Sequence, residues 1–232
     1  MRLVVAVLLT AGALPLGRAE AAVKYFAVFF AFEDDKHRPE LCHTFVEFIR
    51  AEVEPGAPPV ILQRDLISWL PASGIVRVHA IRAELGKNYS LEETFAIADA
   101  RGLRLLSWGP YEMTPRAYGL ALDRKAELES GSVDYKAIDI FTIANRSANC
   151  MHAVAEIDPQ ARRIGEYNIK YGDDATRQVI RYYVRRKFLC NPCCVRQDVF
   201  QVLGYDEGRL ERRHDWEAKF PFRLWRPRLT CP

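Results

Sequence analysis

One uninterrupted apolar run constrains the fold of this chain more than any other feature of its sequence. Residues Tyr25 to Phe32 read YFAVFFAF, a continuous apolar and aromatic stretch of eight residues. Eight residues are too few to cross a bilayer as a helix, and a run of this length is typical of a strand buried on both faces. The run therefore predicts a central strand of a β-sheet.

Four more segments have the composition of strands, because they are rich in β-branched, aromatic or aliphatic side chains. They cover residues 44–49, 60–70, 76–83 and 133–141. The proline-containing segment 54–59 and Pro71 separate the first three of them. Strands that follow one another this closely predict a sheet built from sequential neighbours.

Start and stop signals then predict helices. Ser90 and Glu93 form a capping box, in which each side chain accepts a backbone N–H, and Gly102 ends that helix. A threonine cap followed by proline at Pro115 opens a second helix, which runs to about residue 130.

Two more helices are predicted further along the chain. Asn149 is a strong N-cap, so Cys150 falls in the first turn of the third helix. Asp173 or Asp174 caps a fourth helix that continues through about Lys187. Strands followed by helices predict an α+β fold, with an antiparallel sheet packed with helices.

The first 21 residues are typical of a secretory signal peptide. Arg2 supplies a positive start, Leu3 to Leu16 is an apolar run without charge, and Ala19-Glu20-Ala21 fits the small residues of a cleavage site. We therefore expect an exported protein, periplasmic or extracellular, with no stable membrane span after cleavage. An uncleaved N-terminal anchor is the alternative.

The charge of the chain argues against nucleic acid as a partner. The net charge is +3 over 232 residues, and the arginines are interspersed with acids. Such a pattern is typical of an ordinary solvated surface. We expect no nucleic-acid binding.

Cys150 and His43 form the most suggestive chemical pair. The unpaired N–H groups of a helix N-terminus favour a thiolate and can receive an oxyanion. An imidazole on a strand that faces this helix end can act as the base, and a third polar group can orient it. Asp65 is the preferred third group, with Ser68 and His79 as alternatives. Asp65 and Ser68 are three positions apart, so they face opposite sides of a strand.

Two short motifs carry a resemblance to known families. Segment 149–154, Asn-Cys-Met-His-Ala-Val, resembles the Asn-Cys-Glu-His-Phe-Val signature of the lecithin retinol acyltransferase family. Segment 42–48, Cys-His-Thr-Phe-Val-Glu-Phe, resembles the histidine strand of that family and of Lnb-type N-terminal periplasmic domains. These families share a circularly permuted, NlpC-like papain fold, with the histidine strand before the cysteine helix. The order of His43, Asp65 and Cys150 agrees with this arrangement.

The resemblance implies a thiol hydrolase or acyltransferase with Cys150 as nucleophile and His43 as base. We expect three segments: a signal peptide (1–21), a papain-like α+β domain (22–172), as the resemblance implies, and a C-terminal helix with a cysteine-containing extension (173–232). The expected substrate is an amide or ester, with peptidoglycan peptides, acylated proteins and lipids of the cell envelope as candidates. No cofactor is expected. The alternative is a non-catalytic exported structural or binding domain with a disulfide-stapled C-terminus.

The remaining cysteines leave their roles open. They are Cys42, Cys190, Cys193, Cys194 and Cys231. In an exported chain we expect one or two disulfides in the C-terminal segment. The Cys190–Cys193 spacing also suits a zinc site, with His214 among the further candidate ligands, or a thioredoxin-like redox pair. The aromatic and arginine-rich tail that follows is expected to pack against the main domain.

Overall fold

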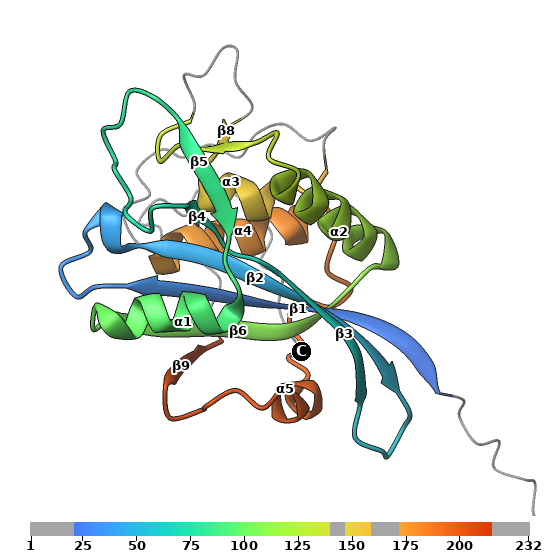
Figure 1. The fold of residues 1–232 in the computed structure, drawn as a ribbon. Coiled ribbons are helices and arrows are strands. Elements are labelled where there is room, and N and C mark those ends of the chain that lie inside the picture. The colour runs from blue at the N-terminus through green and yellow to red at the C-terminus, as the bar shows by residue number, and fades with distance from the viewer. Residues whose placement is uncertain (1–20, 140–146, 159–171, 215–232) are drawn as a thin grey trace, which may run out of the picture.

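The computed structural model describes residues 21–139, 147–158 and 172–214. Its centre is a five-stranded sheet with the order β3-β2-β1-β6-β9. The strands are β1 (Ala22–Glu33), β2 (His43–Val53), β3 (Val60–Ile67), β6 (Arg104–Met113) and β9 (Leu210–Arg213). All neighbouring pairs are antiparallel except β6 and β9, which run parallel. The apolar run of the sequence is β1, in the middle of this sheet (Figure 1).

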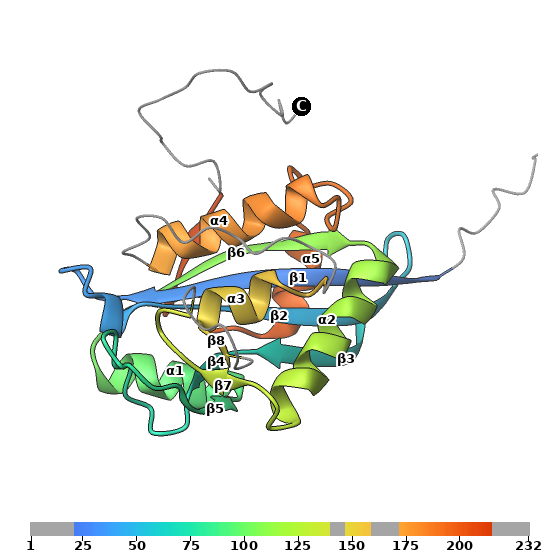
Figure 2. The ribbon, with the colours of Figure 1, turned by 90° about the horizontal axis from the view of Figure 1, so that it is seen from above.

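Helices cover both faces of the central sheet (Figure 1). One face carries α2 (Pro115–Glu129), α3 (Cys150–Ala155) and α4 (Gly172–Arg185). The other face carries α1 (Leu91–Ala100) and α5 (Gln197–Leu203). Seen from above, α3 lies over β1 and β2 (Figure 2).

Alternate side chains of β1 belong to two separate hydrophobic cores. Phe29 packs edge-on against Tyr183 of α4, whereas Phe30 packs edge-on against Phe95 of α1. Both phenylalanines are fully buried. Because successive side chains of a strand point to opposite faces, a strand between two helical layers needs apolar residues at every position. This explains the unbroken apolar run.

A second, smaller sheet lies beside the first and has the order β4-β5-β7-β8. Its strands are β4 (Trp69–Pro71), β5 (Glu84–Asn88), β7 (Asp134–Tyr135) and β8 (Ser147–Ala148). The indole N–H of Trp69 donates to the backbone oxygen of Ala148 at 3.2 Å. This bond fixes the chain just before α3 begins. A short 3-10 helix, Pro39–Leu41, joins β1 to β2.

The α+β class is confirmed, and the first three predicted strands pair as sequential neighbours. The prediction of a strand over 76–83 is wrong, because this segment is a loop without a partner strand. Its valines and isoleucines favour strands only where a sheet surface receives them. The strand predicted over 133–141 forms only at Asp134–Tyr135, and its last two positions lie outside the described residues.

All four predicted helices are present, with the Ser90–Glu93 capping box formed. The prediction that Asp173 or Asp174 caps the fourth helix is wrong, because α4 begins at Gly172 and both aspartates lie in its first turn. The sequence does not predict β6, because Gly109 and Pro110 in its interior are strand-breaking signals. It also does not predict α5 or β9.

The part of the chain after residue 172 contributes to the same layers as the rest. The Thr176 hydroxyl of α4 lies 2.6 Å from the Thr44 hydroxyl of β2, and β9 extends the central sheet. The described part of 173–232 is therefore integrated with the main domain. The predicted signal peptide and the aromatic tail lie outside the described residues. Within the described ranges, no helix has the length and hydropathy that crossing a bilayer requires.

Candidate functional site

Cys150 is the first residue of α3, as the sequence predicts. Asn149 caps this helix, and its side-chain oxygen accepts the backbone N–H of His152 at 2.8 Å. The Cys150 side chain is partly exposed. The local setting expected for a reactive thiol is therefore present at the helix start.

His43 lies on the other face of the central sheet. It is the first residue of β2, opposite Phe32 of β1. Its ring stacks on Phe45 with the ring centroids 5.2 Å apart, and its Nε2 lies 2.9 Å from the Ser68 hydroxyl. That hydroxyl in turn lies 2.8 Å from the hydroxyl of Thr94 on α1. The imidazole is thus buried in the core beneath α1.

The structure therefore does not bring His43 and Cys150 together. The residue of β2 that points toward the α3 side is Thr44, which contacts α4, and Cys42 shares this side by the alternation of the strand. Cys150 interacts electrostatically with Cys42, whereas burial alone accounts for the shifted pKa of His43. Cys42 and His43 are neighbours in sequence, and the register of β2 in the sheet directs Cys42, rather than His43, toward α3.

Burial also makes the His43 imidazole a weaker base. It lowers the pKa of the imidazole from 6.5 to about 3, so the ring is neutral at physiological pH. A general base works best with a pKa near the operating pH. The side chain is only 1% exposed, and its Nδ1 has no hydrogen-bond partner among the described residues.

Asp65, the expected third group, lies apart from His43. It faces α2, where it pairs with Lys125 at 3.1 Å and accepts a hydrogen bond from Tyr118 at 3.4 Å. Burial and the Asp65 charge together raise the pKa of Tyr118 to about 12. Ser68, an alternative for the third role, is the residue that contacts His43. The prediction that Asp65 and Ser68 face opposite sides is confirmed.

Sequence reasoning missed a buried carboxylate–imidazole pair close to Cys150. The Nδ1 of His152 lies 2.7 Å and 2.6 Å from the two carboxylate oxygens of Asp139. One of these oxygens also accepts the backbone N–H of Asn149 at 3.2 Å. Both side chains are fully buried. A histidine directly after a capped helix start was the only sequence signal, since Asp139 lies 13 positions earlier in the chain.

A buried pair of this kind orients the start of α3 from within the core. Cys150 and His152 are two positions apart on a helix, so their side chains do not share a face. The Asp139–His152 pair therefore positions the backbone that carries Cys150, while its own polar atoms are closed to solvent. It stabilises the helix start and presents no surface to a substrate.

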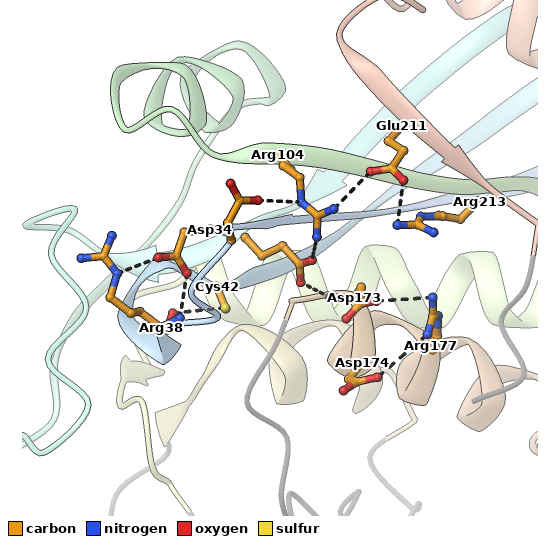
Figure 3. Close-up of polar contacts among 11 residues, drawn as sticks. Asp34, Arg38, Cys42, Arg104, Asp173, Asp174, Arg177, Glu211 and Arg213 are labelled. Carbon is orange, nitrogen blue, oxygen red and sulfur yellow. Dashed lines mark hydrogen bonds and ion pairs between the residues drawn. The ribbon is translucent and has the colours of Figure 1, made fainter. Parts of the chain in front are cut away.

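Cys42 is a poorly ionised thiol. Burial is the largest cause that raises its pKa to about 12, and the carboxylates of Glu33 and Asp34 and the nearby Cys150 raise it further, while the backbone N–H of Gly172 opposes them. Its sulfur donates to the backbone oxygen of Arg38 at 3.2 Å (Figure 3). Cys42 is therefore a weak nucleophile at neutral pH.

An ion-pair network lies next to Cys42 and ties four elements together (Figure 3). Glu33, at the end of β1, accepts the backbone N–H of Asp173 in α4 at 3.1 Å and pairs with Arg104 of β6 at 2.5 Å. Arg104 also pairs with Glu211 of β9 at 3.6 Å. Each carboxylate in this network is matched by an arginine or a backbone donor, so the network serves the fold.

The C-terminal cysteines differ in oxidation state. Cys193 is disulfide-bonded, whereas Cys190 and Cys194 are exposed thiols. Within the described ranges, no group of three or more histidine, cysteine or acidic side chains could hold a metal ion. Cys231 lies outside these ranges.

We predict a specific alkylation pattern under native, non-reducing conditions. Iodoacetamide should modify Cys190 and Cys194, while Cys193 should react only after reduction and unfolding. Cys190 should react more slowly than a simple thiol, because burial and then the Glu112 carboxylate raise its pKa. Peptide mass spectrometry with and without prior reduction measures this. Modification of Cys193 without reductant would contradict the disulfide.

Comparisons with known proteins add no relative to this description. A scan against protein-family models, a search of curated proteins and a search of solved structures each found no match to the chain.

Proposed function

We propose that this chain is an exported, non-catalytic binding domain whose C-terminal part is stapled by the Cys193 disulfide. The observation that carries the proposal is the position of His43 on the face of the central sheet opposite α3, which bears Cys150. In this position the His43 imidazole cannot supply the activation that acyl transfer by the Cys150 thiol requires. The other nearby imidazole, His152, is fully buried with Asp139.

We further propose that the fold is a variant of the permuted papain-like arrangement. The order of elements supports this: the histidine strand β2 precedes the cysteine helix α3, and the helix packs on the same sheet. In this variant the histidine of the motif serves the core beneath α1. The fold is then retained for binding rather than for chemistry.

A thiol hydrolase or acyltransferase acting on an amide or ester is the second candidate. The partly exposed Cys150 at an Asn149-capped helix start favours it. It requires a base other than His43, or a rearrangement that moves the imidazole across the sheet. The first proposal needs neither.

The test compares the reactivity of Cys150 with and without His43. We expect the rate at which a thiol-directed acyl probe labels Cys150 to be the same in the wild type and in His43→Gln, with no turnover of an aryl ester. Cys150→Ala identifies the labelled site, and Ser68→Ala is the matched control for disturbing the same buried contact. Circular dichroism verifies that each variant is folded.

A catalytic pair predicts a different result. Loss of a general base lowers a rate by about 10²-fold or more. A drop of that size in folded His43→Gln, but not in Ser68→Ala, or catalytic ester turnover by the wild type that Cys150→Ala abolishes, would overturn the proposal in favour of the enzyme. A pH–rate profile of wild-type labelling that follows a single thiol ionisation supports the binding domain.

A further inference from the structure

The loop between β4 and β5 exposes apolar side chains that the fold does not cover. This β4–β5 loop, residues 72–83, projects from the edge of the molecule beside the small sheet (Figure 1). Ile81 is 91% exposed and Ile75 is 57% exposed, and Leu85 at its base is 64% exposed. Single exposed aliphatic residues are common, but two in one projecting loop and a third at its base expose more apolar surface than is usual for a short segment.

The loop is held in shape by hydrogen bonds and by Val76, which packs against both hydrophobic cores. The backbone N–H of Ala72 donates to the oxygen of Leu85 at 2.8 Å and closes its base. Arg101, which follows α1, donates to the backbone oxygen of Gly74 at 2.7 Å. The Ser73 hydroxyl donates to Glu84 at 3.2 Å. These bonds order the backbone of the loop, in which Ile75 and Ile81 remain exposed.

Basic side chains alternate with the apolar ones in this loop. Arg77, His79 and Arg82 are all exposed, and no acidic residue occurs from Ala72 through Ala83. Glu84, just after the loop, lies 3.5 Å from Arg77. The projecting surface is therefore both aliphatic and positively charged.

We infer that the β4–β5 loop docks on an anionic lipid bilayer surface. Aliphatic side chains enter the boundary between headgroups and acyl chains, while arginines remain at the level of anionic headgroups. A protein partner is favoured less, because interface centres are enriched in aromatic residues and this loop contains none. Exposed isoleucines interspersed with arginines instead match the two layers of a membrane surface.

This inference deepens the proposed function, on which it rests, by naming the partner of the binding domain. It involves neither Cys150 nor His43, so vesicle binding and acyl-probe labelling report on separate parts of the molecule. A failure of one experiment leaves the result of the other unchanged.

The test is co-sedimentation of the purified, folded chain, lacking residues 1–21, with vesicles of phosphatidylcholine alone or mixed with phosphatidylglycerol. We expect binding to the anionic vesicles that weakens as salt is raised. Ile75→Ser/Ile81→Ser should reduce the partition coefficient by about tenfold or more, because two buried aliphatic contacts are lost. Arg82→Ser should weaken binding to anionic vesicles only.

A matched control separates this loop from general surface hydrophobicity. Val60→Ser/Leu62→Ser removes two exposed aliphatic side chains, 57% and 46% exposed, from β3 at the opposite end of the molecule (Figure 1). This control should bind vesicles as the wild type does. Equal loss in both double variants, or no binding of the wild type to anionic vesicles, would overturn the inference. Binding of an acidic protein in the absence of any vesicle binding would replace it with a protein partner.

Discussion

Asp139→Ala should lower the free energy of unfolding by about 2–6 kcal/mol. The carboxylate of Asp139 accepts from two buried donors, the Nδ1–H of His152 and the backbone N–H of Asn149. Each buried donor that loses its acceptor costs about 1–3 kcal/mol. The loss should also loosen the start of α3, because Asn149 is its N-cap. Urea denaturation followed by circular dichroism measures the effect.

Two further variants sharpen this prediction. Asp139→Asn keeps one acceptor oxygen, so it should lower the free energy of unfolding by less than Asp139→Ala does. Asp65→Ala is the matched control, since its carboxylate pairs with a partly exposed Lys125 and such pairs contribute about 0–1 kcal/mol. Equal destabilisation by Asp139→Ala and Asp65→Ala would show that the buried pair does not hold this region.

The second large effect is a loss of stability in acid that depends on His43. Burial lowers the pKa of the folded imidazole to about 3, against 6.5 for the exposed group. Between these values the unfolded chain binds a proton that the folded chain does not, so stability falls as the pH falls. The slope contributed by one such group is about 1.4 kcal/mol per pH unit. The full contribution of the neutral His43 ring to the free energy of unfolding is present above pH 6.5.

A difference measurement isolates the His43 contribution from that of the carboxylates. His43→Phe removes the titrating ring and keeps an aromatic side chain next to Phe32 and Phe45. The stability lost by the wild type between pH 7 and pH 4.5 should exceed that lost by His43→Phe by about 2–3 kcal/mol. His79→Gln, which changes an exposed histidine, should behave as the wild type. Parallel pH profiles for all three proteins would mean that His43 is not buried as a neutral ring.

Both predictions concern buried histidines, and the burial of these side chains also supports the proposed function. His43 and His152 are both committed to the interior, one beneath α1 and one beside Asp139. Both side chains are buried, so each contributes to the packing and hydrogen bonding of the interior. The β4–β5 loop, by contrast, places apolar and basic side chains in solvent, where they are available to a partner.

Local patterns in the sequence predicted most of the central architecture. The apolar run of β1, the capping box at Ser90 and the Asn149 cap each depend on residues within a few positions of one another. Such signals act on the backbone directly, and the structure bears them out. The strand β6 was not predicted, because Gly109 and Pro110 are local strand-breaking signals. Pairing with β1 overrides these signals in the folded chain.

The face on which each candidate residue lies was decided only by the tertiary structure. A strand alternates its side chains with a period of two, so the sequence states that Cys42 and His43 face opposite ways but not which of them faces α3. That choice depends on which helix covers which side of the sheet, and it is made by distant residues such as Thr176 of α4 and Thr94 of α1. The sequence by itself determined the strand, the helix and the thiol at its start. Packing of distant segments decided that the imidazole would be buried away from it.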